Sequence, residues 1–386
     1  MAAGRSGEVC LLGRTSEPKF PRVSHRGTSY SEFHWYAYTV RTWLKPAQSD
    51  HASAGIQAKS EICRQMKSPT REALEQAAAV IHSVMQPTPQ IHWPLLDGPI
   101  GAEVWIKHEN HTPVGSFKIR GGLVYFNELR RQISDVTGVI AATRGNHGQS
   151  IAFAGQRHGL KVTIVVPYGN SREKNAAMRS RNVELIEYGN DFQEALEHAE
   201  HLSRTKGLHL VPSFDEALVL GVASYSIELF RAVPDLHTLY VPIGLGSGIC
   251  GALAAREALS LKTEIVGAVA KAAPAYQQSF ALQRPVAKPV NPTIADGISC
   301  RVPNPDALTL ILHGVARIIA VDETEIRSAM RQLYTATHNV AEGAGAVALA
   351  ALIHERERQK GRRVAVALTG GNVDRSVFAQ VLTEDD

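Results

Sequence analysis

The sequence predicts an α/β protein of two domains, with a three-layer αβα architecture and parallel-rich sheets. Residues 138–211 alternate short β-branched strands with helices, and residues 216–372 repeat that alternation. Such alternation is typical of parallel sheets covered by helices. A chain of 386 residues is also long enough to bury two cores of medium size.

The chain divides into three parts. Residues 1–65 keep no steady period of 2 or 3.6 and are predicted to be a poorly ordered extension. Residues 138–212 are predicted to form a small α/β domain. The segments 66–137 and 213–386 together are predicted to form a large domain. A ligand should lie between these two domains, at the carboxyl ends of the strands.

Period and capping signals place the individual elements. The first helix is expected to begin at Ser68, with Ser68 as its cap, Pro69 at the first helical position and Glu72 in the first turn. Further helices are expected at 117–131, 146–158, 171–180, 191–206, 216–233, 249–259, 322–338 and 343–359. Strands are expected at 102–109, 138–143, 161–167, 183–188, 208–212, 238–243, 264–270, 317–321 and 363–372.

Composition and charge argue against several classes of protein. The formal net charge is +4, and the first 65 residues hold nine Lys and Arg against five Asp and Glu, so the remainder is neutral. A nucleic-acid partner is therefore poorly supported. No uncharged apolar run approaches the roughly 20 residues that cross a bilayer. The four cysteines show no metal-ligand spacing, so we expect reduced thiols, no metal and a cytoplasmic protein without a membrane anchor.

A glycine-rich turn joins a strand to a helix in "VPIGLGSGICGALAA". This arrangement aims backbone N–H groups and a helix dipole at a phosphate, although it also fits a plain tight turn. Gly246, Gly248 and Gly251 match GxGxxG, but a dinucleotide site would also need an acidic residue after the following strand. That strand ends at Lys271. A single phosphate monoester is therefore the favoured ligand.

Lys118 lies between a phenylalanine and the start of a helix, in "HTPVGSFKIRGG". A lysine desolvated beside a pocket has a lowered pKa and becomes a nucleophile toward aldehydes. A solvated surface lysine is the commoner fate of this residue type. The spacing alone does not decide between the two.

Four motifs taken together carry a resemblance. "SFKIRGG", "TRGNHGQS", "PIGLGSGICG" and "LTGGNVD" follow one another in that order from Ser116 to Asp374. They closely resemble pyridoxal-phosphate enzymes of fold type II, and within them the serine/threonine dehydratase (ammonia-lyase) and serine racemase family. The resemblance covers nearly all of the chain from Ser68 onward and implies a fold like that of the tryptophan synthase β subunit.

The resemblance implies roles for particular residues. Lys118 would form a Schiff base with pyridoxal 5'-phosphate, and Phe117 would pack against the cofactor. Asn146 would donate to the ring hydroxyl oxygen, and Thr369 would face the pyridine nitrogen. The phosphate would be held by Gly244, Leu245, Gly246, Ser247 and Gly248.

The substrate would be bound by Thr143, Arg144, Gly145 and His147, which surround a helix N-terminus where backbone N–H groups can hold a carboxylate. For the His147 side chain, a structural role is favoured over acid–base catalysis. Arg144 replaces the serine with which racemases protonate the second face, so racemisation is doubtful. Arg144 could bind a substrate carboxylate or could point to solvent or a neighbouring acid.

Two further departures bear on the site. Residues 269–276 contain no acidic residue where racemases and some dehydratases bind a divalent cation, so metal activation is not expected. Thr369 replaces the more usual serine or cysteine. An uncharged hydroxyl at the pyridine nitrogen favours prompt loss of a β-substituent over a long-lived carbanion.

The expected activity is therefore α,β-elimination. A 3-hydroxy L-amino acid such as threonine or serine would give a 2-oxo acid and ammonia, with Lys118 as the base. Alternatives are dehydration of 3-hydroxyaspartate, phenylserine or a hydroxyectoine-derived substrate, β-replacement, or a non-catalytic binding protein. A nucleotide-dependent oxidoreductase is disfavoured by Lys271. Dimerisation is expected from the resemblance alone.

Overall fold

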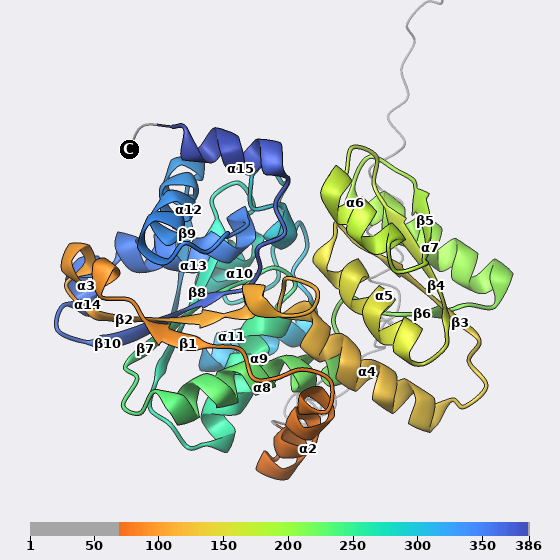
Figure 1. Ribbon diagram of the computed structural model, residues 1–386, viewed down its shortest axis with the longest axis horizontal. Coiled ribbons are helices and arrows are strands. Elements are labelled where there is room, and N and C mark those ends of the chain that lie inside the picture. The colour runs from red at the N-terminus through yellow and green to blue at the C-terminus, as the bar shows by residue number, and fades with distance from the viewer. Residues whose placement is uncertain (1–68, 385–386) are drawn as a thin grey trace, which may run out of the picture. The chain divides into compact units, whose positions relative to one another are not determined.

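The computed structural model describes residues 69–384 (Figure 1), so the expected extension at residues 1–65 lies outside the described residues. Two sheets organise this part of the chain. A six-stranded sheet has the order β1-β2-β10-β7-β8-β9, and a four-stranded sheet has the order β5-β4-β3-β6. Every pairing is parallel except that of β1 with β2. The predicted α/β class with parallel-rich sheets is confirmed.

The elements have the following bounds. The strands are β1 (Gln90–His92), β2 (Glu103–His108), β3 (Gly138–Ala142), β4 (Lys161–Val166), β5 (Glu184–Glu187), β6 (His209–Leu210), β7 (Thr238–Pro242), β8 (Glu264–Ala270), β9 (Arg317–Val321) and β10 (Arg363–Leu368). The helices are α2 (Arg71–His82), α3 (Pro94–Ile100), α4 (Lys118–Gln132), α5 (Asn146–Arg157), α6 (Arg172–Arg179), α7 (Phe192–Lys206), α8 (Glu216–Ala232), α9 (Ser247–Ala258), α10 (Ala275–Leu282), α11 (Pro305–Gly314), α12 (Glu323–Thr337), α13 (Gly343–His354), α14 (Arg356–Gln359) and α15 (Arg375–Leu382). Two short 3₁₀ turns are η1 (Glu109–His111) and η2 (Asp296–Ile298).

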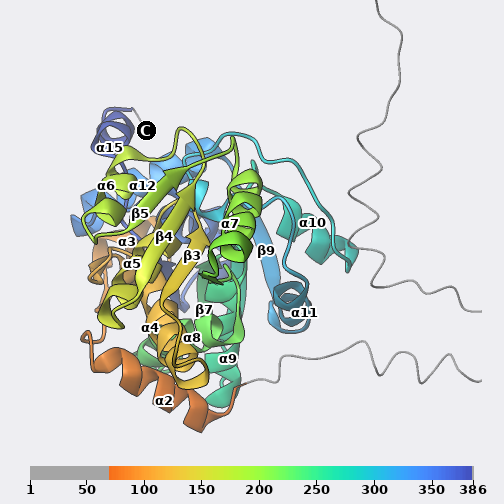
Figure 2. The same cartoon turned by 90° about the vertical axis from the view of Figure 1, so that its right-hand side faces the viewer.

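The smaller sheet is built by successive βαβ crossovers. Helices α5 and α6 lie on one face of it and α7 on the other, as Figure 2 shows. This follows from the strand order, because β3 to β5 step in one direction and β6 returns to the far side of β3. The carboxyl end of β3 therefore delivers residues 143–147 to the start of α5 at one edge of the sheet.

The larger sheet lies between α12 and α13 on one face and α8 and α9 on the other (Figure 1). Helix α13 is apolar on all sides and is buried along nearly its whole length, which is typical of a helix in the centre of a core. The parallel strands β2, β10 and β7 all end at the same edge. Lys118 follows β2, Thr369 follows β10, and the glycine loop, residues 244–248, follows β7, so all three lie at this edge.

Several predicted boundaries are corrected. Helix α2 begins at Arg71 with Thr70 as its cap, because the Thr70 side chain accepts a hydrogen bond from the Ala73 backbone N–H, whereas Ser68 lies outside the described residues. The helix expected at 343–359 breaks into α13 and α14 at Glu355, whose carboxylate is held by Arg317. Five elements were not predicted from the sequence: β1, α3, α10, α11 and α15. None of the helices in the described part is long and apolar enough to cross a membrane.

Candidate active site

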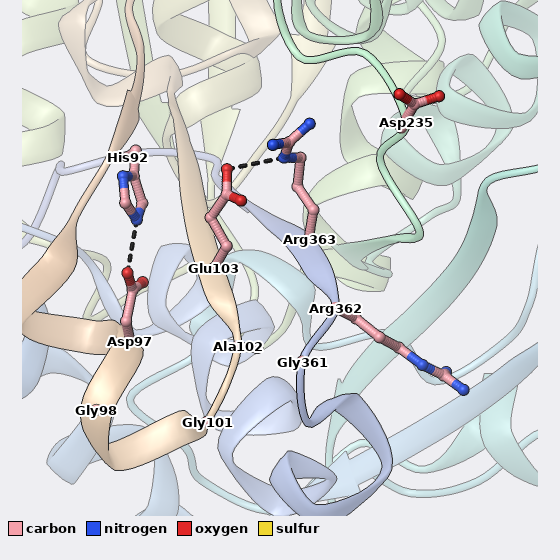
Figure 3. Close-up of a pocket in the computed structure, with 10 residues that line it drawn as sticks. All are labelled: His92, Asp97, Gly98, Gly101, Ala102, Glu103, Asp235, Gly361, Arg362 and Arg363. Carbon is pink, nitrogen blue, oxygen red and sulfur yellow. Dashed lines mark hydrogen bonds and ion pairs between the residues drawn. The ribbon is translucent and has the colours of Figure 1, made fainter.

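A pocket of about 810 Å³ opens at the amino-terminal ends of β2 and β10 (Figure 3). Its charged side chains largely satisfy one another, since His92 lies 2.6 Å from Asp97 and Glu103 lies 2.7 Å from Arg363. The residues singled out from the sequence instead follow the carboxyl-terminal ends of strands β2, β10, β7 and β3. In open parallel sheets, ligands bind at the carboxyl ends, so the candidate site lies there and not in this pocket.

Lys118 begins α4, and its side chain turns toward the glycine loop. Its Nζ donates a hydrogen bond of 3.1 Å to Oγ of Ser247 and lies 4.9 Å from the centre of the Phe117 ring. The Phe117 ring in turn packs edge-on against Tyr225. Burial lowers the pKa of Lys118 to about 8, so a substantial fraction of its amine is uncharged near neutral pH. The structure therefore gives Lys118 the environment of a nucleophile.

Backbone hydrogen bonds hold the segment around Thr369 beside the residues that precede Lys118. The Phe117 N–H donates to the Thr369 carbonyl over 3.0 Å, and Ser116 pairs with Gly370 in an isolated antiparallel bridge. The Thr369 side chain is buried, and among the described residues its hydroxyl makes one hydrogen bond, a long one of 3.5 Å to the Ala344 carbonyl. Its hydroxyl therefore remains able to bond to another group in the site.

The glycine loop presents a row of backbone N–H groups. Residues 244–246 lead into α9, and none of the N–H groups from Gly244 to Ile249 donates a hydrogen bond within the described part of the chain. Gly246 has a φ of +106°, and a Cβ on it would lie 2.6 Å from Cβ of Ala307. Only glycine therefore fits at this position. The loop can bind a phosphate without any basic side chain.

Asn146 begins α5, and hydrogen bonds to both the nitrogen and the oxygen of its side-chain amide fix its orientation. Nδ2 donates to Oε1 of Glu342 over 2.5 Å, and Oδ1 accepts from Nδ2 of Asn372 over 2.8 Å. The second hydrogen on Nδ2 is left to donate elsewhere. Asn372 itself also donates to the Val114 carbonyl, four residues before Lys118. Through Asn372, these bonds hold the start of α5 close to the residues that precede Lys118.

The loop before α5 is shaped by Thr143. Its Oγ1 accepts hydrogen bonds from the backbone N–H groups of Gly145 and Gly148, at 2.9 and 3.2 Å. The backbone N–H groups of Asn146 and His147 donate no hydrogen bond to any described residue. They lie in the first turn of a helix, where a carboxylate is favoured by the dipole.

His147 is a neutral imidazole. Its ring hydrogen-bonds to the Pro212 backbone, and Nε2 is buried without a partner in residues 69–384. Burial, together with the nearby charge of Lys118, lowers the pKa of His147 to about 3. A histidine of this kind does not become charged near neutral pH.

Arg144 is half-buried on the same loop. Its guanidinium makes no ion pair or hydrogen bond with any residue that the structure describes. The expected alternative, an acidic neighbour that pairs with Arg144, is thus not seen among these residues.

The matches to known proteins identify the family. A model of the family described as "pyridoxal-phosphate dependent enzyme" matches residues 81–370. The chain belongs to this family. The predicted family and cofactor are thereby confirmed. The match to the family begins at residue 81, close to residue 69, where the described part of the chain begins.

Within this family, the chain is similar to enzymes named for threonine and serine. The L-threonine ammonia-lyase of Thermotoga maritima is 31% identical over 82% of this chain and 78% of its own. The processed form of threonine deaminase isoform 2 from Solanum lycopersicum has a TM-score of 0.74 at 28% identity, covering 81% of this chain and 93% of that one. Maize serine racemase has a TM-score of 0.76 at 25% identity, covering 81% and 96%.

The residues of this pyridoxal-phosphate enzyme fit the cofactor. The amine of Lys118, whose lowered pKa suits attachment of an aldehyde, lies 3.1 Å from Oγ of Ser247, and the loop that contains Ser247 has backbone N–H groups without a partner in residues 69–384, which could hold a phosphate. An oriented amide and an uncharged hydroxyl are available for the ring. In the described residues, no group of three or more His, Cys, Asp or Glu side chains could hold a metal ion.

Sequence reasoning missed three members of the site. Glu342 is buried directly before α13, and Lys174 on α6 lies 3.2 Å from it and 3.0 Å from Asp296. Although burial opposes it, the two carboxylates raise the pKa of Lys174. Asn372 stood inside the quoted motif "LTGGNVD" without an assigned role. A lone acidic residue before a wholly apolar helix was the available signal for Glu342.

Proposed function

We propose that this chain is a pyridoxal-phosphate-dependent lyase that converts threonine or serine to a 2-oxo acid and ammonia. Its relatives include L-threonine ammonia-lyase at 31% identity and threonine deaminases with the same fold, and their lengths are largely covered by this chain. The observation that carries the proposal is the position of the Lys118 amine, partly buried between the Phe117 ring and Ser247 of the glycine loop.

Each side chain has a task that its surroundings support. When bound, pyridoxal phosphate supplies an aldehyde for attachment of an amine and a ring that withdraws electrons from the substrate Cα. Lys118 would hold the aldehyde and, once displaced by the substrate amine, would remove the α-proton as a base with a pKa of about 8. The free N–H groups of Asn146 and His147 would hold the substrate carboxylate.

The other assignments follow from the same contacts. Gly244, Leu245, Gly246, Ser247 and Gly248 would hold the phosphate, and Asn146 would donate its free amide hydrogen to the ring oxygen. The hydroxyl of Thr369 would face the ring nitrogen. Because Arg144 replaces a serine, a second protonation from that position is not available, and elimination is favoured over racemisation.

Replacement of Lys118 tests the proposal. Lys118→Ala should release no ammonia from threonine and should not retain the cofactor after reduction with borohydride, whereas the exposed Lys262→Ala should behave as wild type. Peptide mass spectrometry of the reduced wild type should place the cofactor on Lys118. Full activity in Lys118→Ala would overturn the proposal. Retention without ammonia release in the wild type would favour a non-catalytic binding protein.

Product analysis separates elimination from β-replacement. Ammonia and a 2-oxo acid released without any added thiol support elimination, while a requirement for the thiol supports replacement.

A specific observation also favours a second substrate class. The half-buried guanidinium of Arg144, which has no partner in residues 69–384, lies on the loop before α5 and would suit a substrate with a β-carboxylate, such as 3-hydroxyaspartate.

The state of the protein in the cell is also part of the proposal. We propose a cytoplasmic homodimer that binds no nucleic acid, consistent with the neutral charge of the chain after residue 65. Light scattering of the purified chain at several concentrations would give the mass of the assembly. A monomer at all of them would remove the dimer from the proposal.

A further inference from the structure

Other contacts must fix the orientation of the peptide groups in the glycine loop, residues 244–248, because its N–H groups donate no hydrogen bond to any described residue. From Gly244 to Ile249, no backbone N–H has a partner in residues 69–384. The first regular helical bond of α9 is that of Cys250 N–H to the Gly246 carbonyl, at 3.0 Å. Six free donors in sequence can bind an anion well only if their peptide planes are held in place.

Tyr276 on α10 provides such support. Its hydroxyl donates to the Leu245 carbonyl over 2.9 Å and accepts from the Asn304 backbone N–H over 3.0 Å. Both bonds use the same oxygen, so the hydroxyl hydrogen is directed to Leu245. The side chain is almost wholly buried, and burial raises the pKa of its phenol, which stays uncharged.

The bond to Leu245 determines where the next N–H points. In a trans peptide, the C=O of one residue and the N–H of the next point in opposite directions. Since the Leu245 carbonyl points to Tyr276, the Gly246 N–H points away from Tyr276. The same carbonyl would be the helical acceptor for Ile249 N–H, and that bond is absent from the described structure. The Ile249 N–H is thereby also left free.

Packing supports this arrangement. A Cβ on Gly246 would come within 3.4 Å of the Tyr276 hydroxyl and 2.6 Å of Ala307 on α11. Asn304, whose N–H bonds to Tyr276, caps the same α11 through its side chain. The hydroxyl of Tyr276 thus connects α10, α11 and the glycine loop.

We propose that Tyr276 is a positioning residue for the phosphate-binding loop, which orients the peptide between Leu245 and Gly246 so that the loop's N–H groups converge on the cofactor phosphate. This inference rests on the proposed function. Tyr276 does not touch the reacting atoms. Its contribution should therefore appear in the affinity for the phosphate group and not in the reaction of Lys118 with an aldehyde.

The test compares two ligands in two variants. Dissociation constants of the apoprotein are measured by absorbance for pyridoxal 5'-phosphate and for pyridoxal, which lacks the phosphate. Tyr276→Phe keeps the ring and removes the hydroxyl. Tyr240→Phe is the matched control, because Tyr240 is a buried tyrosine with two hydrogen-bond partners, Glu355 and Gln359, away from the loop.

In Tyr276→Phe, the dissociation constant for pyridoxal 5'-phosphate should rise about tenfold, while that for pyridoxal should stay within a factor of about two. Tyr240→Phe should change neither. Equal weakening for both ligands, or no weakening for either, would overturn the role of Tyr276. Failure of the wild type to react with either aldehyde would instead contradict the proposed function itself.

Discussion

Arg120 on α4 donates from Nη1 to Oε1 of Glu228 on α8 over 2.7 Å, and neither side chain is more than 9% exposed. The same Arg120 binds Glu109, and Lys107 on β2 lies 2.6 Å from Glu228. These buried charges join β2, α4 and α8. Because α4 begins at Lys118, the network fixes the helix whose first residue is the proposed nucleophile.

Glu228→Gln is expected to destabilise the apoprotein strongly. The change removes a carboxylate that balances Arg120 and Lys107, and loss of one partner in a buried ion network costs about 3–5 kcal/mol. Urea unfolding followed by circular dichroism measures the difference. Glu357→Gln, which breaks an exposed pair with Lys360, should leave the unfolding midpoint unchanged.

The stability contributed by Glu228 should depend on pH. Burial alone would raise the pKa of Glu228, but the Arg120 guanidinium outweighs it and lowers that pKa to about 2. A carboxylate with a depressed pKa contributes its full stability above its unfolded value, about 4.3, and loses it as the pH falls toward 2. Wild type and Glu228→Gln should therefore converge in stability below pH 3. A constant difference between pH 7 and pH 2.5 would contradict this.

The amine of Lys118 should titrate well below an ordinary lysine. Burial lowers its pKa to about 8, so its uncharged fraction rises through that pH, about two units before the usual value of 10.4. Acylation of the apoprotein by an amine-directed reagent at several pH values, read by mass spectrometry, measures this. The Lys118 peptide should approach its maximal rate by pH 9. A rate that keeps rising in parallel with that of the exposed Lys262 would refute the shift.

A side chain at Gly246 should abolish tight cofactor binding. Gly246→Ala forces a positive φ on alanine and places Cβ 2.6 Å from Ala307, so the loop must move. The affinity for pyridoxal 5'-phosphate should fall at least about tenfold. Gly207 also has a positive φ, of +66°, but has open space around it, so Gly207→Ala carries the strain without the collision. Comparable affinity losses in the two variants would show that strain, and not the loop's shape, is responsible.

Arg144 should determine substrate preference if it binds a β-carboxylate. Arg144→Ala should then lower kcat/KM for 3-hydroxyaspartate about 10- to 100-fold relative to that for threonine, because a charge-assisted hydrogen bond is lost. Ammonia release from both substrates gives the ratio. Equal losses on the two would remove Arg144 from substrate selection.

The order of strands and helices could be predicted because each follows from local period. The segments 264–270 and 317–321 agree with β8 and β9 at both ends. The missed elements have no such pattern: β1 has three residues, and α3 contains an internal proline and a glycine. The last long helix breaks at Glu355, whose carboxylate bonds to Arg317, 38 residues away, a contact that no local pattern reveals.

The candidate site was predicted from several motifs taken together. The glycine loop indicated a phosphate ligand by its own pattern, whereas Lys118 and Asn146 were assigned only because four ordered motifs resemble a known enzyme family. Glu342 and Lys174 act through bonds between segments distant in sequence, 196 residues apart in the case of Asn146 and Glu342. Tyr276 was not singled out from the sequence, and its hydrogen bond to the Leu245 carbonyl becomes visible in the structure alone.

Lys174 belongs to the helix that follows β4 of the smaller sheet, whereas Asp296 and Glu342 belong to segments next to the larger sheet. Drawing α6 away from that side would leave Glu342 buried without its cation, at a cost of several kcal/mol. The carboxylate that would suffer also holds Asn146 in place. Separation of the two sheets would therefore remove the cation beside the carboxylate that orients the Asn146 amide, so the same buried charges hold the two sheets together and keep this amide in place.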